Sequence, residues 1–72
     1  MEFVFTAHAR QRGRLRGVTL QMIRSAIEQP SRTGSGYGGR RVAYGEYEGR
    51  GVLKVVYAEE GETAIVITVI WE

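Results

Sequence analysis

A basic segment near the start of the chain contains the residues best suited to chemistry. Residues 8–16 include the only histidine of the sequence and four of its arginines. On a helix, His8, Arg12 and Arg16 would recur along one flank over about 12 Å of the axis. An imidazole exchanges a proton near neutral pH, and guanidinium groups bind phosphate through paired hydrogen bonds. The spacing therefore indicates a site for a phosphate-bearing ligand, with His8 as acid or base and both arginines as clamps.

Each of these residues also has a structural alternative. His8 could cap the helix or pack against a sheet, and an arginine of the row could pair with a sheet glutamate such as Glu46. Arg10 and Arg14 fall on a different side of the same helix. One of the two arginine rows is therefore expected to be ordinary solvated surface.

A second basic group begins a strand that we expect over residues 40–47. Alternation puts Arg41 on one face of this strand, and Arg40 and Tyr44 on the other. Arginine interleaved with tyrosine suits phosphates and unstacked bases, although tyrosines on strands also serve cross-strand packing. Lys54 is the one charge in the next, otherwise apolar strand. It should extend from a sheet edge or point into a concave site.

Three glycines that precede this strand match a nucleotide-binding pattern only by spacing. Gly34, Gly36 and Gly39 satisfy G-x-G-x-x-G, but a helix and a proline precede them and a strand follows. A dinucleotide-binding turn needs the reverse order, a strand before and a helix after. We therefore expect residues 31–39 to form a flexible loop that lets the following arginines reach a ligand.

Composition and charge restrict the class of protein further. The 72 residues suffice for one domain, 1–72. There is no cysteine and a single histidine, so disulfides and ordinary zinc or iron sites are excluded and we expect no cofactor. Residues 1–41 hold eight arginines against two glutamates, whereas residues 42–72 hold two cations against six glutamates. This polarity predicts an anionic partner at the basic end.

The apolar pattern predicts an α+β fold. A short strand at residues 3–5 precedes two helices, one over 7–16 with Thr6 as N-cap and one from Thr19 to Gln29. The apolar side of the first helix is expected at Ala7 and Leu15, with Val18, and that of the second is a stripe of Leu20, Ile23 and Ile27. Three strands follow, at 40–47, 52–58 and 63–71. The expected order is β-α-α-β-β-β, with two N-terminal helices packed on one face of a mainly antiparallel sheet. The last strand is apolar on both faces, which is typical of a central strand. No segment is long and apolar enough to span a bilayer, so we expect a cytoplasmic location and no membrane partner.

The motif His8, Arg12, Arg16-Gly17-Val18, with the helix that ends before Pro30 and the final apolar strand, resembles the RelE/ParE-like toxin superfamily. The resemblance covers nearly the whole chain and is closest to BrnT and its short relatives of unknown function. It implies a RelE-like fold and the toxin of a type II toxin–antitoxin system. Such a toxin is a metal-independent ribonuclease that cuts mRNA and is neutralised by a protein antitoxin.

The resemblance also implies roles for individual residues. His8 would act as base or acid, Arg12 and Arg16 as phosphate clamps, and Arg41 near the developing charge. The expected RNA-binding residues are Arg10, Arg14, Arg40, Tyr44 and Lys54. RNA and a protein antitoxin are thus the expected partners.

Two further hypotheses belong to other classes. One is a non-catalytic module that binds nucleic acid or protein on the same fold. The other is a structural partner protein whose basic helix docks an acidic segment. An edge strand, at residues 3–5 or 40–47, could in addition pair with another copy of the chain to form a homo-oligomer.

Overall fold

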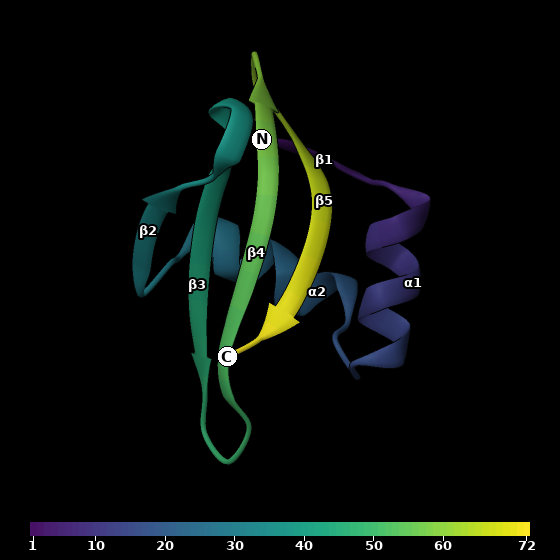
Figure 1. Ribbon diagram of the computed structural model, residues 1–72, viewed down its shortest axis with the longest axis vertical. Coiled ribbons are helices and arrows are strands. Elements are labelled where there is room, and N and C mark those ends of the chain that lie inside the picture. The colour runs from purple at the N-terminus through teal and green to yellow at the C-terminus, as the bar shows by residue number, and fades with distance from the viewer.

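The chain forms two helices and one five-stranded sheet in a computed structural model that describes residues 1–72 (Figure 1). The α+β class and the two N-terminal helices are as predicted, but the order is β-α-α-β-β-β-β. The elements are β1 (Glu2–Phe5), α1 (Ala7–Leu15), α2 (Leu20–Glu28), β2 (Arg32–Ser35), β3 (Arg41–Tyr47), β4 (Gly51–Glu60) and β5 (Thr63–Trp71). A short 3₁₀ turn at Tyr37–Gly39 joins β2 to β3.

The strand order in the sheet is β1-β5-β4-β3-β2. All neighbours are antiparallel except β1, which pairs in parallel with β5. The central position predicted for the last strand is confirmed, because β5 lies between β1 and β4. The predicted loop is corrected, since residues 32–35 form the edge strand β2. Residues 40–47 are therefore not an edge, because β2 pairs along β3.

Both helices begin at the predicted caps. The Thr6 hydroxyl accepts a hydrogen bond from the Ala9 amide at 3.1 Å, and the Thr19 hydroxyl accepts one from the Met22 amide at 3.1 Å. Such side-chain acceptors satisfy amides that the first turn of a helix leaves without partners. In α2, two of the three residues in the predicted apolar stripe are buried, whereas Leu20 is 39% exposed.

The buried face of α1 differs from the predicted one. We expected Ala7 and Leu15 on the apolar side, but Leu15 is 68% exposed and the buried positions are Ala9 and Gly13. Ala9 faces β5, and Gly13 lets the turn at Val18 pack closely against the helix. The Thr6 amide and hydroxyl both donate to the carbonyl of Val66, where the pairing of β1 with β5 ends. As a result α1 lies alongside the part of β5 that β1 leaves unpaired (Figure 1).

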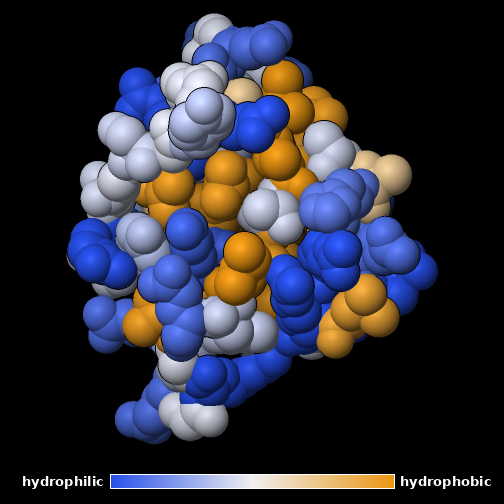
Figure 2. Space-filling model, viewed as in Figure 1, coloured by the Kyte–Doolittle hydropathy of each residue, from blue (hydrophilic) through white to orange (hydrophobic).

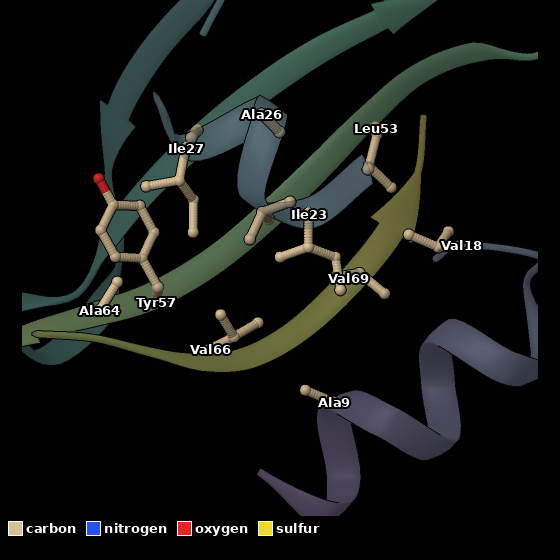
Figure 3. Packing of buried hydrophobic residues seen from close by; sticks show 12 residues of the cluster. Ala9, Val18, Ile23, Ala26, Ile27, Leu53, Tyr57, Ala64, Val66 and Val69 are labelled. Carbon is tan, nitrogen blue, oxygen red and sulfur yellow. The ribbon is translucent and has the colours of Figure 1, made fainter. Parts of the chain in front are cut away.

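The core forms between α2, α1 and one face of the sheet. Figure 3 shows Ile23 and Ile27 of α2 directed at the strands, with Ala9 of α1 facing β5 from the side. The cluster of twelve buried residues comprises Ala9, Val18, Ile23, Ala26, Ile27, Ala43, Leu53, Val55, Tyr57, Ala64, Val66 and Val69. A bulge in β5 directs both Val69 and Val66 at the core, because Val56 pairs with Thr68, Tyr57 pairs with Val66, and Ile67 between them has no partner residue.

The other face of the sheet carries no helix. Figure 1 views this open face with α2 behind the strands, and Figure 2 shows apolar side chains gathered in its middle with polar side chains around them. Strand alternation assigns Val4, Val56, Ile65 and Ile70 to the open face, and Val4 and Ile70 are 49% and 38% exposed. Neither helix has the length and apolar composition needed to cross a membrane.

Candidate nucleic-acid interface

The row of His8, Arg12 and Arg16 lies on one flank of α1, where His8 is exposed and the other two are half-buried. Arg10 marks the opposite flank, because its guanidinium carbon lies 5.7 Å from the centre of the Phe5 ring. That ring packs against the core on the side of α2. Since these flanks lie on opposite sides of the buried stripe, His8 and Arg12 border the open face of the sheet.

Arg16 is held in place by backbone contacts at the end of α1. Its Nη1 donates to the carbonyl of Val69, and its own carbonyl accepts from Trp71 Nε1 at 2.8 Å and from Arg50 Nη2 at 3.2 Å. The guanidinium of Arg50 also lies 4.5 Å from the centre of the Trp71 ring. These contacts fix the end of α1 to β5, so Arg16 holds the row in position.

The structure contradicts the alternative in which an arginine of this row pairs with a sheet glutamate. The two ion pairs of the structure are Arg41 Nε with Glu59 Oε1 at 2.7 Å and Lys54 Nζ with Glu72 Oε2 at 3.9 Å. Neither Arg12 nor Arg16 lies within ion-pair distance of a carboxylate. Their charges are therefore not neutralised within the chain.

A polar row crosses the open face from β2 to β4. Arg32 pairs with Tyr44, Tyr44 with Lys54, and Lys54 with Ile70, so all four side chains lie on the same face in register. The guanidinium carbon of Arg32 lies 4.0 Å from the centre of the Tyr44 ring, which is a close cation–π contact. The side chain of Lys54 is 31% exposed, on an inner strand. Lys54 therefore lies on the open face and not at a sheet edge.

Arg41 lies on the opposite face of the sheet from this row. It pairs across strands with Tyr57, whose side chain belongs to the core, and it forms the ion pair with Glu59. Burial raises the pKa of the Tyr57 hydroxyl; the charge of Glu59 also raises this pKa, and Arg41 opposes it. Arg41 is thus separated from His8 by the sheet itself. Arg40 is exposed after the 3₁₀ turn.

The structure thus divides the predicted residues among three surfaces. His8 and Arg12 adjoin the open face that carries Tyr44 and Lys54. Arg10 and Arg14 line a separate hollow with Val18, Thr19 and Leu20, on the other flank of α1. Arg41 begins β3 on the face that carries the core, where it pairs with Glu59, and Arg40 is exposed directly before this strand. No group of three or more histidine, aspartate or glutamate side chains gathers in a way that could hold a metal ion.

Sequence reasoning missed Arg32. Its segment, Arg-Thr-Gly-Ser, has no alternation of apolar and polar residues and is exposed at every position. The prediction of a loop therefore hid the fact that strand pairing would put Arg32 directly beside Tyr44. No side-chain pattern in the sequence marked this pairing.

The chain belongs to the family described as "Domain of unknown function (DUF4258)", whose model matches residues 5–71. This match includes α1, α2 and the strands β2 to β5, together with the last residue of β1. No curated protein and no solved structure matches the chain.

Proposed function

We propose that this protein is a RelE-like ribonuclease toxin that binds single-stranded RNA on the open face of its sheet and is neutralised by a protein antitoxin. The observation that carries the proposal is the row Arg32, Tyr44 and Lys54, with His8 and Arg12 at the border of the same face. The order and pairing of strands also resemble the RelE-like topology.

The open face offers the two kinds of contact that an unpaired strand of RNA requires. The cations can contact phosphates, and the apolar side chains between them can contact base faces and riboses. Three inter-strand spacings separate Arg32 from Ile70, about 14 Å in all. The flank of α1 with Arg12 extends the basic path beyond β5. An RNA strand could therefore cross the sheet from β2 to α1.

Cleavage on this face needs no metal in the proposed mechanism. The 2′-oxygen of a ribose forms a bond to the adjacent phosphorus, and the bond from that phosphorus to the 5′-oxygen of the next nucleotide breaks. The products are a 2′,3′-cyclic phosphate and a 5′-hydroxyl, so one proton leaves the 2′-oxygen and one joins the 5′-oxygen. His8 exchanges one of these protons and water the other. Arg12 stabilises the extra negative charge on the phosphate oxygens.

One observation favours the second candidate, a non-catalytic RNA-binding module on the same fold. His8 makes no hydrogen bond to another side chain, whereas catalytic histidines are commonly oriented by a partner. In this alternative the row on the open face binds RNA, and His8 is an exposed side chain with no catalytic role.

A cleavage and binding experiment separates the two candidates. The probe is a 20-nucleotide fluorescein-labelled RNA of mixed sequence, incubated with the protein in excess EDTA. We expect cleavage to products with cyclic phosphate ends, and we expect His8→Gln to slow it by about a hundredfold or more while affinity stays within about twofold. Gln11→Ala, an exposed change on the same helix, serves as the control and should alter neither quantity.

Each other outcome has a defined meaning. Salt-dependent binding of the RNA probe without cleavage would reject the ribonuclease and favour the non-catalytic binding module. In both cases Lys54→Met should reduce the slope of log affinity against log salt by about 0.7, the value for one phosphate contact on a single strand. Absence of RNA binding would reject both candidates. Induced expression of the ribonuclease should arrest growth, and co-expression of the neighbouring gene should relieve the arrest.

A further inference from the structure

A second basic surface lies on the side of the molecule away from the open face. Two phenylalanine rings of β1, Phe3 and Phe5, stack with centroids 6.2 Å apart and an interplanar angle of 14°. Arg24 of α2 lies over the Phe3 ring at 5.1 Å, and Arg10 of α1 lies over the Phe5 ring at 5.7 Å. The two rings therefore connect guanidinium groups from both helices into one ladder.

A hollow of about 250 Å³ continues this ladder along α1. Arg10 and Arg14 form its basic wall, and Val18, Thr19 and Leu20 form the wall that begins α2. Leu20 is 39% exposed and precedes Arg24 by one helical turn, so these two side chains share a flank of α2. We call the combination of Phe3, Phe5, Arg10, Arg14, Leu20 and Arg24 the α1–α2 surface.

The charge of the α1–α2 surface is not neutralised within the chain. Both ion pairs of the structure involve other residues, Arg41 with Glu59 and Lys54 with Glu72. Glu28 is the only acidic residue in either helix. Stacking on aromatic rings restricts the planes of the Arg10 and Arg24 guanidiniums while their edges stay free to donate hydrogen bonds. Such pre-positioned forks bind carboxylates with a smaller loss of side-chain entropy.

We propose that the α1–α2 surface binds an acidic segment of a partner protein, with the carboxylates on its arginines and an apolar side chain against Leu20. The mixture of groups favours a polypeptide over a nucleic acid. The faces of Phe3 and Phe5 are covered by guanidiniums and are not free to stack on bases. The exposed Leu20 beside the arginines matches a chain that alternates acidic and apolar residues, whereas the backbone of RNA offers only sugars and phosphates.

This proposal does not depend on ribonuclease activity, because the α1–α2 surface and the open face lie on opposite sides of the sheet. An RNA strand and an acidic segment could occupy their surfaces at the same time. Loss of one function on mutation should therefore leave the other intact.

The test uses two fluorescein-labelled probes, poly-L-glutamate and a random copolymer of glutamate and leucine, with affinity measured by fluorescence anisotropy at low salt. The first variant replaces three arginines of the α1–α2 surface by glutamine: Arg10→Gln, Arg14→Gln and Arg24→Gln. The control variant makes the same charge change elsewhere: Arg32→Gln, Arg40→Gln and Lys54→Gln. Circular dichroism and urea unfolding establish that both variants are folded before binding is compared.

We expect the first variant to lose at least about tenfold in affinity for the copolymer and the control to stay within about threefold. Wild-type protein should bind the copolymer more tightly than poly-L-glutamate, and Leu20→Ser should remove that preference. Equal losses in both variants would overturn the proposal, because attraction would then follow net charge alone. Absence of copolymer binding would also overturn it. So would a loss of affinity of the first variant for the RNA probe that equals its loss for the copolymer.

Discussion

Replacement of Thr6 by alanine tests whether one residue joins α1 to the sheet. Its Oγ1 accepts from the amide of Ala9 at 3.1 Å and donates to the carbonyl of Val66 at 2.9 Å. Loss of an N-cap threonine costs about 1 kcal/mol. Loss of the second hydrogen bond costs about 1 kcal/mol more, and no carbonyl is left without a donor because the Thr6 amide also bonds to Val66. We therefore expect Thr6→Ala to lower the free energy of unfolding by about 2 kcal/mol.

Thr19→Ala is the matched control. Thr19 caps α2 through the Met22 amide at 3.1 Å, but its hydroxyl makes no hydrogen bond to the sheet. We expect this change to cost about 1 kcal/mol. The difference between the two variants measures the hydrogen bond from Thr6 to β5. For a domain of this size, 1 kcal/mol corresponds to about 4–8 °C in Tm.

Urea unfolding monitored by the fluorescence of the single tryptophan measures both changes. A domain of this length is expected to have about 4–11 kcal/mol of stability, so both variants should remain folded in water. The slope m should not change, because the surface exposed on unfolding is the same. Thr6→Ser, which keeps the hydroxyl, should restore most of the stability. Equal costs for Thr6→Ala and Thr19→Ala, or a serine variant as unstable as the alanine one, would refute the reasoning.

Three further predictions concern the core, the end of α1 and high pH. Leu53→Ala, at a completely buried position in β4, should lower the free energy of unfolding in urea by about 2–5 kcal/mol. Trp71→Phe keeps an aromatic ring but removes the hydrogen bond to the Arg16 carbonyl, which Arg50 still contacts; a loss of about 1 kcal/mol is expected by circular dichroism in urea. Because the pKa of Tyr57 is raised in the folded protein, the hydroxyl of Tyr57 ionises at lower pH in the unfolded chain than in the folded one. Tm should therefore fall as the pH rises above about 10, whereas below that pH this hydroxyl should not affect Tm. Tyr57→Phe should lessen that alkaline fall, and an identical Tm profile between pH 8 and 11 in the variant would contradict the assignment.

Strong apolar periodicity was enough to predict most of the fold. β5 is apolar on both faces and is indeed an inner strand, and α2 has a regular apolar stripe and begins at the predicted cap. β2 could not be predicted in this way, because its residues are polar or glycine and are exposed. The hydrogen bonds of β2 to β3 are made by backbone groups, and these groups are the same whatever the sequence. Side-chain pattern therefore carries no information about this edge.

The buried face of α1 was missed for a related reason. Large apolar residues usually mark the face of a helix that packs, but this helix packs through Ala9 and Gly13. A small residue gains little from burial, and its value lies in the close approach that it permits. At Gly13 an added Cβ would lie 3.0 Å from the carbonyl oxygen of Val18, which shows how close the following turn comes. Only the tertiary structure reveals that approach.

The sequence predicted which residues of the candidate site share one flank of α1, but it did not predict which face of the sheet that flank borders. The spacing of His8 and Arg12 correctly implied one flank of a helix. Which side of the sheet that flank borders depends on where α1 lies relative to β5, and this follows from the hydrogen bonds of Thr6 to Val66. The same placement separates Arg41 from the row, a separation that residue types and spacing do not encode.

The parallel pairing of β1 with β5 has a consequence for how the protein folds during its synthesis on the ribosome. Glu2 pairs with Thr63 and Phe5 with Val66, so β1 cannot pair until β5 has been synthesised, about sixty residues later. Contacts so distant along the chain slow folding, since a large loop must close before they form. A nascent chain that ends before Thr63 also lacks the strand against which α1 lies. The basic helix α1 therefore lacks its contacts with the sheet until β5 has been synthesised.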